Sequence, residues 1–264
     1  MKNINCIVFL LLILSSGFIN AQNISCDFSC METDEASALI NAAAEIEQNA
    51  IRNFGQSVTI GEEMRLGVQL LNDLKSKYNV YEYGERHARM KAIMNSLVSK
   101  ITSPRGFTYR IFLFDADELN AFTCGGKIFV TKKMYHFCQN DSELAAIIGH
   151  EIAHNELKHI RDNISRYKTA SSFGSAGQMT ALIGSMLTTP FNQKNEVHCD
   201  FYGIDLMKKA GYSICSAPEI WRRMAAQENE TSELDKFAST HPYSSTRRTC
   251  CLHHIESNYQ KSCE

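Results

Sequence analysis

His150-Glu151-Ile152-Ala153-His154 places two histidines four residues apart in this chain. On an α-helix, residues at this spacing lie on one face and are separated by a single turn. Both imidazoles can therefore bind the same zinc ion, and the glutamate can reach a water molecule on the metal without binding the metal itself. The motif H-E-x-x-H thus indicates a zinc ligand pair and a general base on one helix.

The residues around the motif predict the helix that it requires. Apolar side chains recur at helical spacing, namely Leu144, Ile147, Ile148, Leu157 and Ile160. Asn140, Asp141 and Ser142 supply N-cap chemistry, and Glu143 stands three residues after Asn140, as in a capping box. The alternatives are a chance match and an exposed histidine pair. A buried apolar helix, however, rarely holds three such polar side chains without a ligand.

Residues 1–21 have the features of a secretory signal peptide. Lys2 precedes an apolar run from Cys6 to Ile13, and Ala21 ends a segment that suits cleavage. The apolar run is too short to span a bilayer, which favours export over a membrane anchor. Lipidation at Cys26 is a weaker alternative, because the residues before it fit a lipobox poorly. We expect a periplasmic or secreted protein and leave peripheral membrane association open.

Composition limits the classes of function. The chain has 264 residues and a formal net charge of −2, with no long run of like charge, so nothing suggests binding to nucleic acid. Nine of its ten cysteines follow the signal peptide, and the cysteines of an exported protein are expected to form disulfides. Because nine is odd, at least one thiol lies outside any intrachain pair. The pairing and the oligomeric state cannot be deduced from the sequence.

We divide the mature chain into a helical extension at residues 22–59 and a domain at residues 60–264 that holds the motif. Helices are expected near residues 35–53, 61–78 and 86–100, and strands at Phe107–Phe114 and at Lys127–Thr131 after Gly125-Gly126. The apolar segment at residues 181–187 is too short for a membrane span and suits a helix or flap over the site.

Zinc catalysis needs a third protein ligand and an open position for water. Residues 195–206 have helical character, and the Lys208-Lys209-Ala210-Gly211 sequence marks the end of that helix. Glu196 and Asp200 share a face of it, so Glu196 is a candidate ligand and Asp200 a candidate hydrogen-bond partner for a ligand histidine. A solvated carboxylate pair is the alternative. His198 projects to another face, and His159 is expected to make structural hydrogen bonds at the end of the motif helix.

The order of several motifs resembles that of the zinc metalloproteases that include the HtpX and CAAX prenyl endopeptidases, and most closely their exported, BepA-like branch. The resemblance covers most of the mature chain and rests on residues 60–63, 115–122, 125–130, 143–146, His150–His154, His159, 196–200, Gly203, Thr240-His241-Pro242 and Arg247.

The resemblance implies an α+β fold of gluzincin type, mainly helical, with a small sheet packed on the metal-binding helix. It implies one Zn²⁺ held by His150, His154 and Glu196, with Asp200 beside the ligands. It also implies a role near the site for His241 and Arg247, either of which can stabilise an oxyanion. The strand after Asn120 is expected to pair with extended protein or peptide substrates. The corresponding residues are Asn120, Ala121, Phe122, Gly125 and Gly126.

Two cysteines depart from the family pattern. Cys124 precedes the glycine pair, and Cys199 precedes Asp200, where alanine is usual. Either one is a candidate for a disulfide that ties the cleft together, and a thiolate that bound the metal would make the enzyme latent.

These observations predict a zinc-dependent endopeptidase that acts on exported proteins, with Glu151 activating water and a role in protein quality control. The alternative is a chaperone-like binding module for unfolded envelope proteins, with weak or latent cleavage. An exopeptidase or another zinc hydrolase also fits the motif by itself.

Overall fold

The computed structural model describes residues 24–31, 35–170, 191–228, 241 and 244–263. The signal peptide and the apolar segment at residues 181–187 lie outside these ranges. The described helices are α1 (Glu35–Phe54), α2 (Ile60–Lys77), α3 (Glu85–Val98), α4 (Lys132–Phe137), α5 (Asp141–Glu156), α6 (His159–Ala170), α8 (Gln193–Ala210), α9 (Ser216–Glu228) and α11 (Ser244–Tyr259). The strands are β1 (Val80–Tyr81), β2 (Arg110–Phe114), β3 (Ala121–Cys124) and β4 (Lys127–Thr131).

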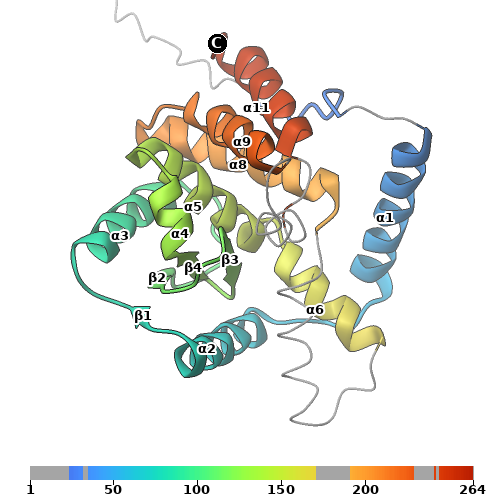
Figure 1. The fold of residues 1–264 in the computed structure, drawn as a ribbon. Coiled ribbons are helices and arrows are strands. Elements are labelled where there is room, and N and C mark those ends of the chain that lie inside the picture. Colours follow the sequence, from blue (N-terminus) through green and yellow to red (C-terminus); the bar gives the residue numbers. More distant parts are fainter. Residues whose placement is uncertain (1–23, 32–34, 171–190, 229–240, 242–243, 264) are drawn as a thin grey trace, which may run out of the picture.

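This composition confirms an α+β fold that is mainly helical (Figure 1). None of the described helices combines the length and hydropathy that a bilayer span requires. The helices expected near residues 35–53, 61–78 and 86–100 correspond to α1, α2 and α3.

The small sheet has the strand order β1-β2-β4-β3, with β2 and β4 parallel and β3 antiparallel to β4. The predicted strand at 127–131 is confirmed as β4, but β2 begins at Arg110 and not at Phe107, because its pairing with β4 starts at Lys127. The β3–β4 turn uses Gly125 and Gly126, at φ of 55° and 78°. A side chain on Gly125 would lie 2.1 Å from the Glu63 carbonyl oxygen, so this turn requires glycine.

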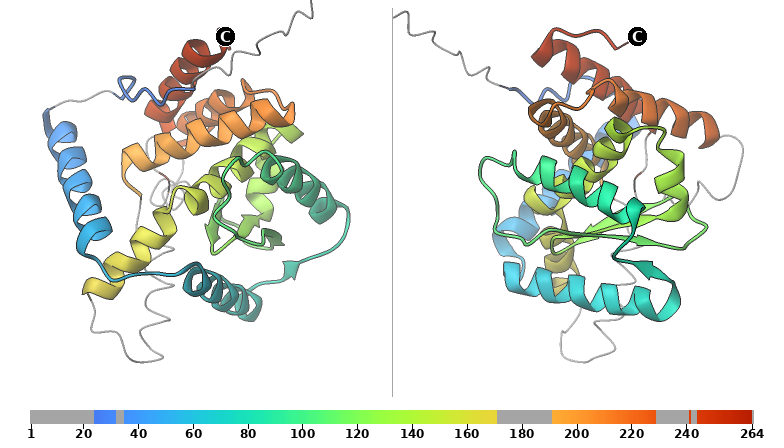
Figure 2. Two further views of the ribbon diagram at one scale, coloured as in Figure 1. Left: turned by 180° about the vertical axis from the view of Figure 1, so that it is seen from behind. Right: turned by 90° about the vertical axis from the view of Figure 1, so that its left-hand side faces the viewer.

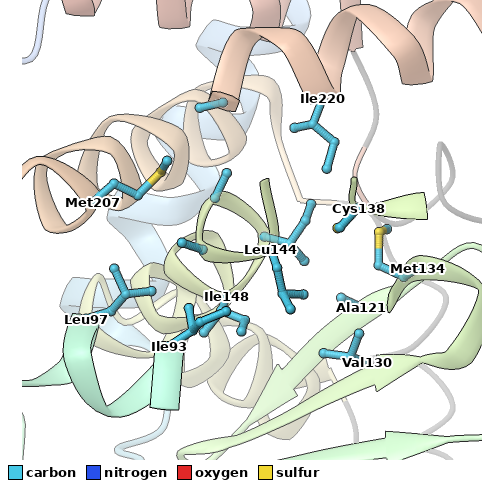
Figure 3. Packing of buried hydrophobic residues seen from close by; sticks show 14 of the residues in the cluster. Ile93, Leu97, Ala121, Val130, Met134, Cys138, Leu144, Ile148, Met207 and Ile220 are labelled. Atoms are coloured by element: carbon cyan, nitrogen blue, oxygen red, sulfur yellow. The ribbon is translucent and has the colours of Figure 1, made fainter. Parts of the chain in front are cut away.

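Alternating side chains of the sheet divide the core into two layers. Ile111, Leu113, Ile128 and Val130 pack with α3 and α5 on one face. Phe112, Phe114 and Phe129 pack with α2 and α6 on the other. Figure 2 shows α2 beneath the sheet, with α8, α9 and α11 beyond α5 on the opposite side. Helix α5 is therefore enclosed between the sheet and a second layer of helices. In Figure 3, Leu144 and Ile148 of α5 lie between residues of α3, α8 and the strands.

Helix α5 begins as its sequence predicts. The Asn140 side chain accepts a hydrogen bond from the Glu143 amide at 3.0 Å. The capping box is incomplete, because the Glu143 carboxylate accepts from the Gln139 amide at 2.7 Å and also pairs with Arg223. The expected continuation of α5 through Ile160 is wrong. The helix ends at Glu156, and Lys158, at φ 69°, turns the chain into α6.

Two glycines allow α5 and α8 to cross closely. A Cβ atom on Gly149 would lie 3.1 Å from Gly203 Cα, and one on Gly203 would lie 3.1 Å from the Gly149 carbonyl carbon. Each is tighter than ordinary van der Waals contact, and backbone cannot rotate aside as a flexible side chain can. The crossing therefore depends on the absence of both side chains.

Cys30–Cys250 and Cys215–Cys263 form disulfides, the first of which joins the segment at residues 24–31 to α11. The free cysteines among the described residues are Cys26, Cys124, Cys138, Cys199 and Cys251. The expectation of disulfides together with unpaired thiols is thus confirmed.

We predict that Gly203→Ala destabilises the protein by about 1–3 kcal/mol, since it forces backbone apart at a packed crossing. Thermal or denaturant unfolding measures the effect. Gly61→Ala is the matched control, because a Cβ there meets nothing closer than 3.7 Å. Equal stability of the two variants would contradict the close crossing.

Candidate metal centre

Four buried side chains from separate parts of the sequence meet at the crossing of α5 and α8. His150 and His154 come from α5, Glu196 from α8, and His241 from the segment before α11. Each offers one donor atom to a group whose atoms all lie within 4.8 Å of one another. The residues predicted as ligands are thereby brought together, although the histidine motif and the glutamate lie far apart in the sequence.

The spacing of these donors fits a zinc ion. Tetrahedral coordination with bonds of about 2.0–2.1 Å separates the donor atoms by about 3.3 Å. The Nε2 atoms of His150 and His154 are 3.0 Å apart, and each lies 3.3 Å from an oxygen of Glu196. His241 Nδ1 lies 3.1 Å from Glu196 Oε2 and 3.4 Å from His150 Nε2. Two imidazoles and a carboxylate are also the donor types that zinc accepts.

The electrostatics of the centre favour a cation. Burial raises the pKa of Glu196, but the charges of His241, Arg247 and His150 outweigh this and hold it well below its usual value. Burial lowers the pKa of His154 to about 3, so its imidazole is neutral, as a ligand must be. Burial and Arg247 lower the pKa of His150, but the neighbouring carboxylates Glu196 and Asp200 raise it, to about 9. The carboxylates that favour a proton on His150 would equally favour a metal ion there.

Asp200 and Arg247 hold the donor residues in place through hydrogen bonds and ion pairs. Asp200 Oδ1 lies 2.9 Å from His150 Nδ1, which places a hydrogen-bond acceptor on the far side of the ring from the donor cluster. The buried Arg247 guanidinium donates to both Asp200 oxygens, at 2.8 and 2.7 Å, and lies 2.8 Å from Glu196 Oε2. Trp221 of α9 stacks on this guanidinium at 3.6 Å. The arginine, which belongs to α11, thus holds two carboxylates of α8 in place.

Glu151 lies beside the donors without belonging to them. Its side chain is buried, with His241 Nε2 3.8 Å from its Oε1. Its Oε2 atom is buried and has no hydrogen-bond partner among the described residues. Burial raises the pKa of this carboxyl group, which moves it in the direction that a general base requires. A buried oxygen without a partner is costly unless something else satisfies it, such as a water molecule or substrate.

His159 is closer to the centre than the sequence indicated. Its Nδ1 lies 3.2 Å from His154 Nδ1, on the opposite side of the ring from Nε2, and 3.3 Å from Cys199 Sγ. His154 can therefore bind a metal through Nε2 while donating its Nδ1 hydrogen to His159. The break after α5 produces this contact, and no helical periodicity could reveal it. His198 is half-buried and lies outside the four-donor group, as expected.

The two unusual cysteines do not form disulfides in this structure. Cys124 and Cys199 are both free and buried. Burial raises the pKa of Cys124 to about 12 and that of Cys199 well above its usual value, so both are protonated thiols. Cys199 contacts His159, and Cys124 Sγ lies 3.8 Å from the Glu63 carbonyl oxygen. The disulfide alternative is therefore wrong for both residues.

The residues expected to bind substrate form one edge of the sheet. Ala121 and Phe122 belong to the edge strand β3, which packs against α5, and Gly125-Gly126 form the turn that follows it. Asn120 precedes β3, and its buried Oδ1 has no hydrogen-bond partner among the described residues.

We predict that Arg247→Ala lowers the free energy of unfolding by about 3–5 kcal/mol, since it leaves two buried carboxylates without their cation. Denaturant unfolding measures the loss. Arg222→Ala is the control, because it removes an exposed ion pair with Glu219 on a helix surface and should change stability little. Similar losses in both variants would contradict the structural role of Arg247.

The fold and the donor group define an α+β protein with a buried histidine and carboxylate centre on an H-E-x-x-H helix. Residues 84–253, more than half of the chain, match the model of Peptidase family M48. The chain belongs to this family, which confirms the resemblance in its motifs.

Curated relatives include two kinds of protease. The mitochondrial metalloendopeptidase OMA1 of Schizosaccharomyces pombe is 34% identical over 138 residues, covering 48% of this chain and 41% of the relative. The beta-barrel assembly-enhancing protease of Escherichia coli is 24% identical over 213 residues, covering 73% of this chain and 44% of the relative. The chain thus matches less than half of the length of either relative.

Proposed function

We propose that this chain is a zinc metalloendopeptidase that cleaves exported proteins. The observation that supports it most strongly is the position of the unpaired Glu151 carboxylate oxygen beside the group formed by His150, His154, Glu196 and His241. A general base adjacent to a group of metal-ligating side chains is the arrangement that metal-assisted peptide hydrolysis requires.

His150, His154 and Glu196 would hold the zinc ion, leaving a position for water. When bound, zinc polarises the substrate carbonyl and lowers the pKa of water to about 7. Asp200 fixes the tautomer and orientation of His150, and His159 does the same for His154. Glu151 takes the proton of the attacking water at its carboxylate and then passes that proton to the leaving amine.

Substrate recognition is assigned to the β3 edge. An extended peptide can add to the edge strand of a sheet through main-chain hydrogen bonds, and Asn120 has an unpaired amide oxygen at the start of β3, the edge strand here. Recognition of backbone suits an enzyme that acts on many unfolded chains. Quality control of exported proteins is consistent with the signal peptide expected at residues 1–21 and with the similarity to the beta-barrel assembly-enhancing protease of Escherichia coli.

We predict that Glu151→Gln abolishes casein cleavage while zinc remains bound, because the amide cannot accept the proton of water. Zinc content and cleavage are measured on the same samples. Glu256→Gln, an exposed change on α11, is the control and should retain full activity. Full activity of Glu151→Gln would refute the role of Glu151. Absence of cleavage by the wild-type protein as well would favour the chaperone-like alternative.

We predict that His241→Ala lowers kcat by about 10²–10³-fold with zinc retained, because His241 stabilises the oxyanion that develops on the substrate carbonyl. Steady-state kinetics on a peptide substrate measure the change. His253→Ala, which removes a partly exposed histidine paired with Asp27, should leave kcat unchanged. An unchanged or increased kcat for His241→Ala would contradict the oxyanion role and would indicate that His241 occupies the position needed by water.

A further inference from the structure

Asn155 connects the proposed base to the proposed substrate strand. It directly follows His154 near the end of α5 and is fully buried. Its side-chain nitrogen donates to the Glu151 carbonyl oxygen at 3.0 Å and to Thr123 Oγ1 at 2.6 Å. Its side-chain oxygen accepts from the Gly126 amide at 3.0 Å. One amide group therefore contacts α5, strand β3 and the β3–β4 turn.

The contacts at Asn155 continue on both sides. The Thr123 hydroxyl, which accepts from Asn155, donates in turn to the Lys127 carbonyl oxygen at 2.9 Å and so spans the hairpin. Arg105 donates to the Asn155 carbonyl oxygen and pairs with the buried Glu63 carboxylate. The Glu63 backbone lies directly against Gly125 in the turn. The turn is thus held between Asn155 on one side and α2 on the other.

We infer that Asn155 is a positioning residue that fixes the separation between the substrate strand β3 and Glu151. This inference rests on the proposed function. A peptide paired along β3 must present its scissile carbonyl to Glu151, and a displacement of about 1 Å in such an arrangement can cost roughly 100-fold in rate. Asn155 bonds the strand that would align the substrate to the helical turn that carries the base. A buried asparagine with all of these contacts satisfied is a rigid connection.

The test compares a long and a short peptide derived from one casein cleavage site. The long peptide, of about ten residues, can pair along the whole of the four-residue strand β3, whereas a form trimmed to about one residue on either side of the scissile bond, with both ends blocked, cannot. We expect Asn155→Ala to lower kcat for the long peptide at least about tenfold and to change kcat for the short peptide less than about threefold. KM for the long peptide should change little.

Thr123 provides a second and milder variant. Thr123→Val keeps the shape and removes the hydroxyl, so it should lower kcat for the long peptide in the same selective way, and Thr123→Ser should restore it. The double variant Asn155→Ala/Thr123→Val should lose less than the product of the single effects, because both changes remove the same contact. If Asn155→Ala does not fold, the comparison of Thr123→Val with Thr123→Ser tests the positioning role in its place.

Loss of activity in equal proportion on both peptides would overturn the positioning role and would indicate a structural defect only. Unchanged kcat on the long peptide would overturn it as well. Zinc content, measured alongside, must remain at the wild-type level. The wild-type protein and Glu151→Gln are assayed on the same peptides. Failure of the wild type to cleave either peptide would refute the proposed function, whereas cleavage by the wild type without the selective loss would refute this inference alone.

Discussion

The contact between Gly149 and Gly203 determines how close α5 and α8 can approach, and the metal centre lies next to that contact. His150 follows Gly149 directly, and Asp200 precedes Gly203 by less than one helical turn. A Cβ at either glycine would meet backbone at 3.1 Å. Because side chains on neighbouring turns move with the backbone, any separation of the helices would withdraw Glu196 and Asp200 from the histidines. The glycine pair therefore sets the size of the donor group.

Close packing also concentrates charge. Three carboxylates, those of Glu151, Glu196 and Asp200, are buried together with the Arg247 guanidinium. Burying ionised groups costs free energy. A site whose buried carboxylates are not fully neutralised by nearby positive charge therefore favours binding of a cation. A metal ion bound at this centre would recover part of the free energy that the protein loses by burying these groups.

The elements that could be predicted from the sequence are those specified by local patterns. The cap at Asn140, the helical end at Gly211 and the strand that follows Gly125-Gly126 depend on neighbouring residues and are confirmed. The contacts of Asn155 and Trp221 join distant segments, so no periodicity indicates them. The sequence does not indicate the break at Lys158, because the apolar spacing continues through it, and for the same reason it does not indicate the contact between His159 and His154. The proposed roles of the metal ligands remain predictions that the geometry supports.

We propose that the side chains at this crossing bind a single zinc ion. The most direct measurement is the zinc content of purified mature protein by elemental analysis, compared with Glu196→Ala and with the exposed change Glu256→Ala. We expect about one zinc per chain in the wild-type protein and in Glu256→Ala, and close to none in Glu196→Ala. A wild-type protein that binds no zinc, or a Glu196→Ala protein that retains it in full, would contradict the proposed zinc centre.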